Sequence, residues 1–596
     1  MLDSAPGAPP ASMYRLDNPL VVQGDGTVLL EVHAARYEEG RDALCRFAEL
    51  EKSPEHVHTY RISPLSLWNA ASAGLGPDEV IASLAELGKY PLPEHVAVEI
   101  RETMARHGRI KLLPASSPDL LRVVFDDELL ARQARSDRRV AEHLGEATGP
   151  LEHEVPMGQR GILKRALVRM GFPADDLVGF RQGPPLDVEL RDSTLSGLPF
   201  GLRAYQREAS EVFHQKGSPS GGHGVIVLPC GAGKTVVGLA VMSMVKQHCL
   251  ILVTNVTAAH QWIREILDKT TLTADQVGEY SGDRKDIKPV TVATYQIVTW
   301  RKDRKGAFPH FTLFNSHDWG LIIHDEVHLL PAPVFRITAD LQGCRRLGLT
   351  ATLVREDGHE DEVFTLIGPK RHDVPWKVLE KQGVIAEASC REVRLDLTQD
   401  LRIEHAVAEQ RQRHRLAAEN PGKIALVREL AKRHAKDRVL VIGQYVNQLE
   451  LIAADLGAPI ITGKTPNSER DDLYAKFRTG EVPLLVVSKV ANFAIDLPDA
   501  NIAIQVSGTF GSRQEEAQRL GRILRPKAGR AMLYSLVTRD TVEQEFAMKR
   551  RLFLTEQGYH YEILDETALR AELKGVSAPT APPTVADATS AREVLR

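Results

Sequence analysis

The stretch from residue 225 to residue 240 constrains the fold of this chain more than any other. Residues 225–228 are apolar and mostly β-branched, residues 229–234 form a Gly-rich turn, and a helical pattern starts at Thr235. A buried strand that runs through such a turn into a helix is a building unit of parallel α/β sheets. The stretch therefore predicts a strand, a loop and a helix within a parallel sheet.

The Gly-rich turn has the composition of a phosphate-binding loop. Glycines at alternate positions let backbone N–H groups approach a phosphate and point at it from the start of the helix. Lys234 is expected to pair with the β- and γ-phosphates of ATP, and the Thr235 hydroxyl is expected to ligate Mg²⁺. The strict loop pattern has Gly where this chain has Leu228, so the general motif is met only in part. The expected nucleotide-binding residues of the loop are Gly231, Ala232, Gly233, Lys234 and Thr235.

Two adjacent carboxylates follow another buried strand, at residues 321–323. Asp325 is expected to hold Mg²⁺ at the carboxyl end of this strand, and Glu326 is expected to orient or deprotonate the attacking water. His324 and His328 flank the pair and suggest a zinc site, but the metalloprotease pattern needs Glu at position 325 and a helix. We therefore reject zinc. The five cysteines form no C-x-x-C pair, which also argues against a zinc site or an iron–sulfur cluster.

A second candidate contact for the phosphates lies nearly three hundred residues further along the chain. Arg522 and Arg525 are one helical turn apart and follow Gln518 and Gly521. Arginines that reach the phosphates from another domain raise hydrolysis by about 10³–10⁵-fold in other nucleotide hydrolases. A chain with both elements can use ATP hydrolysis to open and close a cleft. Gln518, Arg522 and Arg525 are therefore expected to be catalytic residues.

Buried strands alternate with helical patterns in two long regions of the chain, which predicts two tandem α/β domains with parallel sheets. Residues 1–18 and 574–596 are rich in Pro, Ala and Ser or Thr, and they are expected to be disordered. The strands expected in the two domains are residues 225–228, 250–253 and 321–323, and residues 439–442, 484–487 and 502–504.

A smaller unit is expected over residues 19–114. A hairpin is predicted at residues 21–32, turned by Gly-Asp-Gly, and three helices are predicted to start near Pro64, Pro77 and Pro93. This combination is typical of a winged-helix-like module, and equally of a docking domain that binds no ligand.

A second small unit is expected over residues 115–195. Residues 121–125 predict a strand, and residues 163–172 predict an amphipathic helix that ends at Gly171. The basic face of this helix either contacts DNA phosphates or is simply solvated.

The overall charge limits the ways in which this chain can bind nucleic acid. The net charge is −4, so any affinity for DNA must come from local basic grooves. No apolar run is long enough to span a bilayer, and the N-terminus lacks the apolar segment of a signal peptide. We therefore expect a cytoplasmic protein, associated with the nucleoid, that has no membrane partner.

Taken in order, these motifs resemble those of superfamily-two helicases. Gln206 resembles the adenine-reading glutamine of that superfamily, residues 325–328 resemble its DExH box, and residues 349–352 resemble its coupling motif. The loop at residues 228–234 is similar to that of the xeroderma pigmentosum group B helicases, and the triplet Arg355, Glu356 and Asp357 matches a hallmark of those proteins. Further segments similar to that family are residues 366–370, 461–465, 488–490 and 553–559.

The resemblance implies a fold class and a function. It implies two tandem RecA-like parallel-sheet motor domains, preceded by two small α+β accessory domains. It also implies ATP-dependent unwinding of DNA with 3′-to-5′ polarity, in nucleotide excision repair or promoter opening, by a prokaryotic member of the family. The implied domains are an accessory domain at 19–114, a damage-recognition-like domain at 115–195 and RecA-like domains at 196–385 and 386–573.

Residues that contact DNA also follow from the resemblance. Thr254, Thr294, Ser488 and Lys489 lie in segments similar to the strand-contacting motifs of the family, and the Arg355–Glu356–Asp357 triplet is implied to separate the strands. The same comparison places Asp496 among the nucleotide contacts. Residues 398–423 are short and helical, and they match the thumb-like insertion of the family only weakly.

Three functions stay open at this point. The first is a DNA-stimulated ATPase and helicase that acts on forked DNA with a 3′ single-stranded tail, with a repair nuclease as a further partner. The second is a translocase or remodeller that moves on duplex DNA without separating the strands. The third is a non-catalytic DNA-binding scaffold that only holds ATP, although Glu326 and the two arginines argue against it.

Overall fold

The computed structural model describes most of the chain. The described residues are 15–52, 56–117, 119–219, 221–229, 231–282, 284–302, 308–315, 317–330, 334, 341–351, 360–374, 379, 388–488, 500–507, 531–556 and 560–574. Within this part, no helix is long and apolar enough to cross a membrane.

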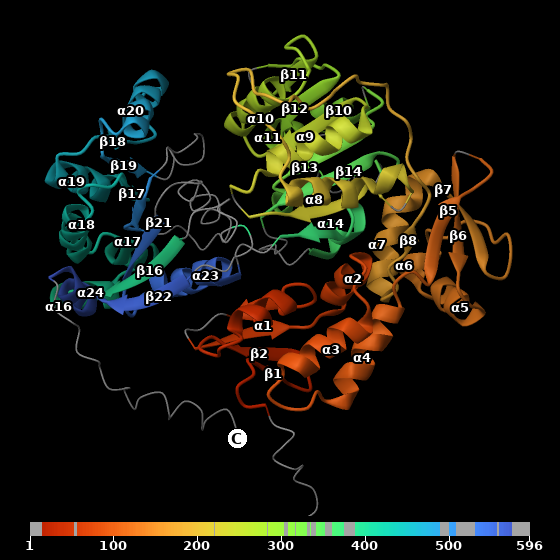
Figure 1. Cartoon of the computed structure of the whole chain (residues 1–596), viewed down its shortest axis with the longest axis horizontal. Coiled ribbons are helices and arrows are strands. Elements are labelled where there is room, and N and C mark those ends of the chain that lie inside the picture. The colour runs from red at the N-terminus through yellow and green to blue at the C-terminus, as the bar shows by residue number, and fades with distance from the viewer. Residues whose placement is uncertain are drawn as a thin grey trace, which may run out of the picture.

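The first large unit is a seven-stranded sheet in which every pair of neighbouring strands is parallel (Figure 1). Along the sheet the strands are β11 (Val277–Tyr280), β12 (Val290–Thr294), β10 (Cys249–Val253), β13 (Leu321–Asp325), β14 (Arg345–Thr350), β9 (His223–Val227) and β15 (Lys370–Asp373). The helices are α8 (Ala204–His214), α9 (Lys234–Val245), α10 (Val256–Lys269), α11 (Tyr295–Val298), α12 (Thr312–Asn315) and α14 (Glu360–Leu366). Because the strands are parallel, all their carboxyl ends meet at one edge of the sheet.

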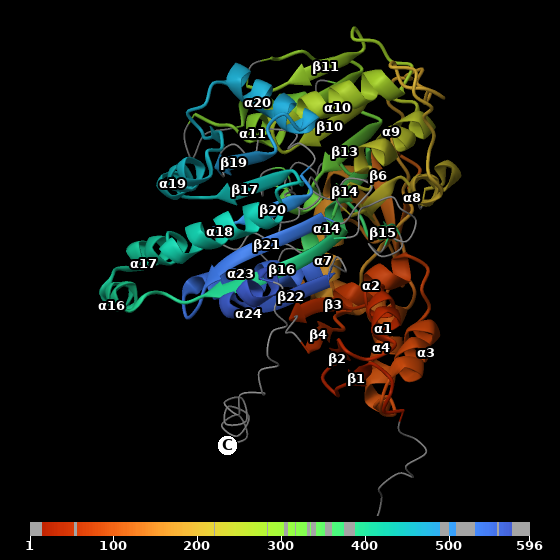
Figure 2. The same ribbon diagram turned by 60° about the vertical axis from the view of Figure 1, so that its left-hand side comes forward.

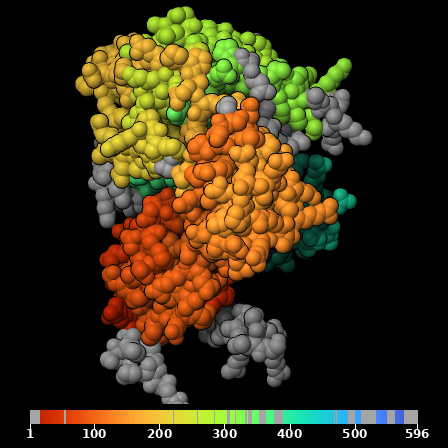
Figure 3. Space-filling model, turned by 90° about the vertical axis from the view of Figure 1, so that its right-hand side faces the viewer, coloured from red at the N-terminus to blue at the C-terminus, as the bar shows by residue number. Residues whose placement is uncertain are grey.

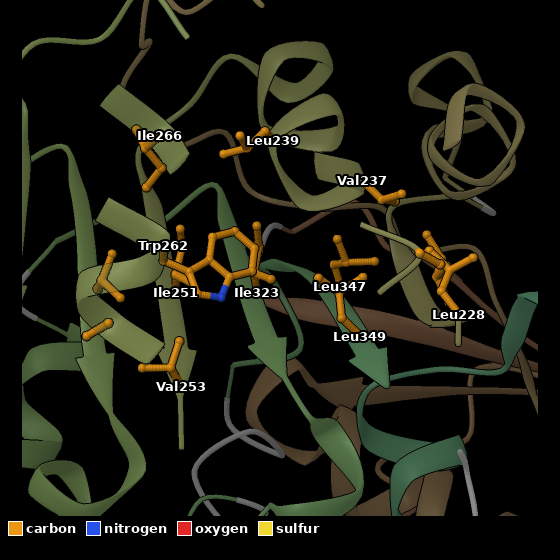
Figure 4. Packing of buried hydrophobic residues seen from close by; sticks show 14 of the residues in the cluster. Leu228, Val237, Leu239, Ile251, Val253, Trp262, Ile266, Ile323, Leu347 and Leu349 are labelled. Carbon is orange, nitrogen blue, oxygen red and sulfur yellow. The ribbon is translucent and has the colours of Figure 1, made fainter. Parts of the chain in front are cut away.

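The core of this unit fixes α9 and α10 on the sheet. Strands β9, β10, β12 and β13 are almost wholly buried, as expected for the inner strands of a parallel sheet, whereas β15 at its edge is partly exposed. Figure 4 shows Trp262 of α10 beside Ile251 and Ile323 of the strands, in the layer that also holds Leu239 of α9. Trp262 is 1% exposed, so one of the largest side chains of the chain lies inside this core.

The second large unit is also a seven-stranded parallel sheet. Its strands are, in order, β18 (Ile460–Ile461), β19 (Leu484–Ser488), β17 (Val439–Gly443), β20 (Ile502–Gln505), β21 (Ala531–Thr538), β16 (Ala388–Leu395) and β22 (His560–Asp565). Its helices are α16 (Gln399–Val407), α17 (Gln410–Ala418), α18 (Pro421–Arg433), α19 (Val446–Leu456), α20 (Asn467–Thr479), α23 (Val542–Glu556) and α24 (Glu566–Leu573). The two sheets confirm the prediction of tandem RecA-like domains.

The weakly matched segment 398–423 forms two short helices and the start of a third. Figure 2 shows α16 and α17 at the outer end of the second large unit. Ile403 and Val407 of α16 are 62% and 81% exposed, so this helix buries little of its apolar surface.

The first small unit has a four-stranded sheet of order β1-β2-β4-β3 and four helices. The hairpin of β1 and β2 is as predicted, with Gly26 at φ 80° in its turn, and Ser63 caps the helix that starts at Pro64. The sequence did not predict β3 and β4, so the sheet is larger than a single hairpin. Bounds are β1 (Leu20–Val22), β2 (Thr27–Glu31), α1 (Tyr37–Leu44), β3 (Glu49–Lys52), β4 (Val57–Arg61), α2 (Pro64–Ser72), α3 (Pro77–Leu87) and α4 (Glu94–Ala105).

The second small unit has a sheet of order β7-β6-β5-β8, and Figure 3 shows it beside the first small unit on one face of the molecule. Because β5 pairs with β6, residues 110–114 belong to this sheet, whereas we predicted that the first unit extended to residue 114. Bounds are β5 (Ile110–Pro114), β6 (Leu120–Phe125), α5 (Glu128–Ser136), α6 (Arg138–Ala141), β7 (Glu152–Pro156), α7 (Arg160–Met170) and β8 (Asp175–Asp176).

Helix α7 ends at Gly171 with φ 90°, as predicted, and its basic residues differ in their exposure. Lys164 is buried, and its Nζ lies 2.9 Å from Asp176 Oδ2 and 3.1 Å from Gln342 Oε1 of the first large unit. Arg165 is half-buried and pairs with Glu362 of α14 across 3.5 Å, whereas Arg169 is exposed. Both alternatives were therefore wrong for Lys164, while contact of Arg165 or Arg169 with DNA stays a prediction.

Candidate active site

The phosphate-binding loop lies between β9 and α9, at the carboxyl edge of the first sheet. Gly231 and Gly233 have φ values of 82° and 81°, in the left-handed region that favours glycine. Gly233 is the residue before α9, so the N–H groups of the first turn of this helix follow directly after the loop. Cys230 of the loop lies outside the described residues.

Side chains from α8 hold the middle of the loop in place. The Tyr205 hydroxyl donates to the Ala232 carbonyl oxygen at 2.7 Å, and Gln206 Nε2 donates to the same oxygen at 3.1 Å. At its other end, Gln206 Oε1 accepts from the Arg203 N–H at 3.0 Å. In this structure Gln206 is therefore a buried support of the loop, and its predicted contact with adenine stays a prediction.

The predicted acidic pair lies beside the loop at the end of β13. Lys234 Nζ is 3.3 Å from Glu326 Oε1, so the loop and the acidic edge are joined by an ion pair. Glu326 has φ 51° and ψ 56°, a left-handed conformation that is uncommon for a residue with a side chain. This turn ends the strand and carries the Glu326 carboxylate toward Lys234.

Asp325 is held by contacts on three sides. Trp262 Nε1 donates to Asp325 Oδ2 at 2.9 Å, and the Glu326 N–H donates to Oδ1 at 3.1 Å. The Tyr295 hydroxyl donates to the Asp325 carbonyl oxygen at 3.0 Å. Burial and the charge of Glu326 raise the pKa of Asp325 to about 6, although the hydrogen bond from Trp262 opposes this rise.

His328 connects the acidic pair to the next strand. Its Nδ1 lies 2.6 Å from Thr350 Oγ1 and 3.7 Å from Glu326 Oε2. Residues 327–329 form a short 3₁₀ turn after a strand, as the rejection of the metalloprotease motif anticipated. The sequence pointed to His328 through that rejected motif and through the resemblance of residues 325–328 to the DExH box, and here it links Glu326 to the predicted coupling motif.

Thr254, Thr294 and Ser488, three of the predicted strand contacts, lie at the carboxyl edges of their sheets. Thr254 follows β10, and its Oγ1 accepts from Asn255 Nδ2 at 3.2 Å. Thr294 ends β12 and caps α11 by accepting from the Ile297 N–H at 3.3 Å. Thr294 and Ser488 are each 1% exposed, so contact of either hydroxyl with DNA requires the neighbouring chain to move.

Several predicted residues cannot be placed. Arg355, Glu356, Asp357, Lys489, Asp496, Gln518, Arg522 and Arg525 lie outside the described residues. Sequence reasoning in turn missed Tyr205, Trp262 and Tyr295. Only Tyr205 had a signal, because it directly precedes the predicted Gln206.

The described residues fit a nucleotide with Mg²⁺. The left-handed glycines leave the loop backbone open, the start of α9 favours an anion, and Lys234 supplies a positive charge. The Asp325 carboxylate and the Thr235 hydroxyl are oxygen ligands of the kind that Mg²⁺ prefers. These two side chains therefore have the chemistry to hold the ion, and their role as its ligands stays a prediction.

Comparisons with known proteins show which family this chain resembles. A family model described as the ERCC3/RAD25/XPB C-terminal helicase matches residues 379–582. A model described as the res subunit of type III restriction enzymes matches residues 199–355, and a helicase conserved C-terminal domain matches residues 20–148. A protein of Kineococcus radiotolerans named DNA 3′-5′ helicase XPB is 52% identical over 551 residues, which cover 92% of this chain and 97% of that protein.

The chain belongs to the XPB helicase family. A protein of Mycobacterium tuberculosis with the same name is 51% identical over 92% of this chain and 98% of its own length. The Saccharomyces cerevisiae protein named general transcription and DNA repair factor IIH helicase/translocase subunit XPB/SSL2 is 31% identical over 91% of this chain and 71% of that protein. The predicted resemblance to this family is thereby confirmed.

Proposed function

We propose that this chain is an ATP-dependent DNA helicase of DNA repair that moves with 3′-to-5′ polarity. The observation that carries the proposal is the ion pair of Lys234 and Glu326, 3.3 Å apart at the carboxyl edge of the first sheet. A binding-only site needs no carboxylate beside its phosphate-binding lysine, whereas a hydrolase needs a group that orients water. Membership of the XPB family supports DNA as the substrate.

The described residues have distinct roles in hydrolysis. In this family the reaction uses ATP with Mg²⁺, which neutralises the charge that develops on the phosphates. Lys234 exchanges its Glu326 partner for phosphate oxygens, which frees the Glu326 carboxylate to orient the attacking water. Gln518, Arg522 and Arg525 are proposed to reach the nucleotide from the second large unit, and Asp496 is proposed to contact it too.

The proposed substrate is forked DNA with a 3′ single-stranded tail. Thr254, Thr294, Ser488 and Lys489 are proposed to hold the sugar–phosphate backbone, so binding should be independent of sequence and should weaken with salt. The triplet at residues 355–357 is proposed to separate the strands. We further propose a repair nuclease as a partner and the nucleoid as the location.

ATP hydrolysis with and without this fork tests the proposal. We expect the fork to stimulate the wild type. We expect Lys234→Ala to abolish hydrolysis while retaining DNA binding, because Lys234 belongs to the proposed phosphate loop and not to the proposed DNA contacts. Hydrolysis that persists in Lys234→Ala would contradict the assignment. Wild-type protein that binds the fork but releases no additional phosphate would favour the scaffold function.

A second function is translocation on duplex DNA without strand separation. It is favoured by the name of the yeast relative, which includes the word translocase. The two functions differ in the strand-separating triplet. If this chain separates strands, substituting Arg355, Glu356 and Asp357 together by Ala should reduce unwinding more than ATP hydrolysis. Equal stimulation by blunt duplex and by fork, with no strand release from either, would instead identify a translocase.

A further inference from the structure

Trp262 contacts Asp325, the proposed Mg²⁺ ligand, from the neighbouring helix α10. It lies in α10, and its indole N–H donates to Asp325 Oδ2 at 2.9 Å. The ring is 1% exposed and packs in the apolar core, so the direction of the N–H is set by close packing on all sides (Figure 4).

The opposite side of the ring depends on a glycine of the phosphate-loop helix. A Cβ at Gly238 would lie 2.5 Å from Trp262 Cη2, which is closer than these atoms can approach, and 3.1 Å from Cζ3, which is a tight contact. Gly238 belongs to α9, the helix that begins at Lys234. The indole therefore fits between α9 and Asp325 only because residue 238 has no side chain.

The other end of α10 lies at the proposed DNA contact. Asn255 caps this helix by accepting from the Ala258 N–H at 2.9 Å, and Asn255 Nδ2 donates to Thr254 Oγ1 at 3.2 Å. Trp262 follows Asn255 by seven residues, about two helical turns along the same rigid element. Any displacement of the cap by a bound strand therefore moves the helix that carries the indole.

We propose that Trp262 is a positioning residue, which fixes the Asp325 carboxylate and makes its orientation depend on the position of α10 and hence on DNA bound at Thr254. The proposal rests on the proposed function, because it assumes that Asp325 holds Mg²⁺ and that Thr254 contacts DNA. Groups that orient the ligands of a metal typically contribute about 10–100-fold to metal affinity or activity. The indole N–H is such a group for Asp325.

The test is equilibrium binding of a fluorescent ATP analogue to the full chain, titrated with Mg²⁺, with and without single-stranded DNA. Trp262→Phe keeps most of the ring but removes the N–H. Trp319→Phe is the matched control, because Trp319 is also buried in the first large unit and donates to the Leu313 carbonyl oxygen at 2.9 Å. Melting temperatures of both variants establish whether they fold.

We expect Trp262→Phe to bind the analogue normally without metal but to need about 10-fold more Mg²⁺ for half-maximal binding. DNA should change the Mg²⁺ concentration for half-maximal binding in the wild type but not in Trp262→Phe. Gly238→Ala should act in the same direction, because its Cβ displaces a ring that still has its N–H. Trp319→Phe should behave as the wild type does.

A wild-type Mg²⁺ requirement in folded Trp262→Phe would overturn the proposal, and so would a DNA-induced shift that survives in this variant. Failure of the proposed function would look different. In that case the wild type would show no DNA-stimulated hydrolysis, while the effect of Trp262→Phe on metal-dependent nucleotide binding would still be measured.

Discussion

At the scale of single residues, the charged and polar side chains of the site pair with one another. Lys234 neutralises Glu326, and His328 joins Glu326 to Thr350. The types of residue in this set could be predicted from the sequence, because phosphate chemistry needs a lysine, a hydroxyl and carboxylates. The pairing of Lys234 with Glu326 could not, because it depends on a left-handed turn at Glu326 that no local residue preference favours.

His324, directly before the acidic pair, should make stability depend on pH. Its ring is buried, neither ring nitrogen has a hydrogen-bond partner among the described residues, and burial lowers its pKa from 6.5 to about 3. Between these two values the unfolded chain binds a proton that the folded chain does not. The free energy of unfolding should therefore fall as the pH falls from about 6.5 toward 3, with a slope of up to about 1.4 kcal/mol per pH unit from this residue.

Urea unfolding at pH 7 and pH 5 checks this prediction. In His324→Phe the loss of stability between these pH values should be smaller than in the wild type by about 2 kcal/mol. His33→Phe, at an exposed position, is the control and should leave the pH dependence unchanged. An identical pH dependence in His324→Phe and the wild type would contradict the assignment of a neutral buried imidazole.

At the scale of elements, the phosphate loop depends on glycine at residue 233. Its φ of 81° strains any other residue, and a Cβ there would lie 2.6 Å from Gln206 Nε2. Gly233→Ala should therefore displace Gln206 and the loop together and weaken ATP binding by at least about 10-fold, since roughly 1–3 kcal/mol of strain is introduced. Gly217→Ala, also at a positive φ of 80° but with open space around its Cβ, controls for backbone strain alone.

Calorimetric titration with ATP and Mg²⁺ measures this effect. Equal affinity in Gly233→Ala and the wild type would show that the loop does not need the left-handed glycine. Equal weakening by Gly217→Ala would show that the effect arises from general strain and not from the loop.

Helix starts and stops were predicted well because their causes are local. Ser63 and Pro64 start α2, and Gly171 ends α7, as their capping chemistry predicts. The burial of Lys164 on α7 was not predicted, because its partner in the first large unit is distant in sequence. Lys164 donates to Gln342, 178 residues away, and periodicity within one helix carries no information about such a partner.

The buried ion pairs between α7 and Asp176 should contribute to the stability of the fold. Arg160 Nη2 and Lys164 Nζ lie 2.8 and 2.9 Å from the two oxygens of Asp176, and all three side chains are buried. Although burial alone would raise the pKa of Asp176, the charges of Arg160 and Lys164 hold it well below its usual range. Asp176→Ala leaves two cations without this partner and should lower the free energy of unfolding by about 3–5 kcal/mol.

Urea unfolding also measures this change. Asp78→Ala, which breaks the exposed pair with Arg101, is the control and should have a much smaller effect. A similar small effect for Asp176→Ala would mean that the ion pairs of Asp176 with Arg160 and Lys164 do not stabilise the fold.

At the scale of the whole molecule, the order of the domains was readable because each α/β region repeats its own pattern of strands and helices. Both large sheets are parallel throughout, so each has one edge at which loops can form a site. The boundary near residue 114 was less readable, because β5 belongs to the second small unit through its pairing with β6, and no local pattern in β5 indicates this partner. The contact of Trp262 with Asp325 could not be predicted from the sequence, because it joins residues 63 positions apart that no motif connects.

ATP hydrolysis at Lys234 is proposed to drive strand separation in one direction. Strand release is measured from forked DNA with either a 3′ or a 5′ single-stranded tail, with the wild type and Lys234→Ala compared in the presence of ATP and Mg²⁺. We expect release from the 3′-tailed fork by the wild type, little release from the 5′-tailed fork, and none with Lys234→Ala. Equal release from both forks, or release by Lys234→Ala, would contradict this proposal.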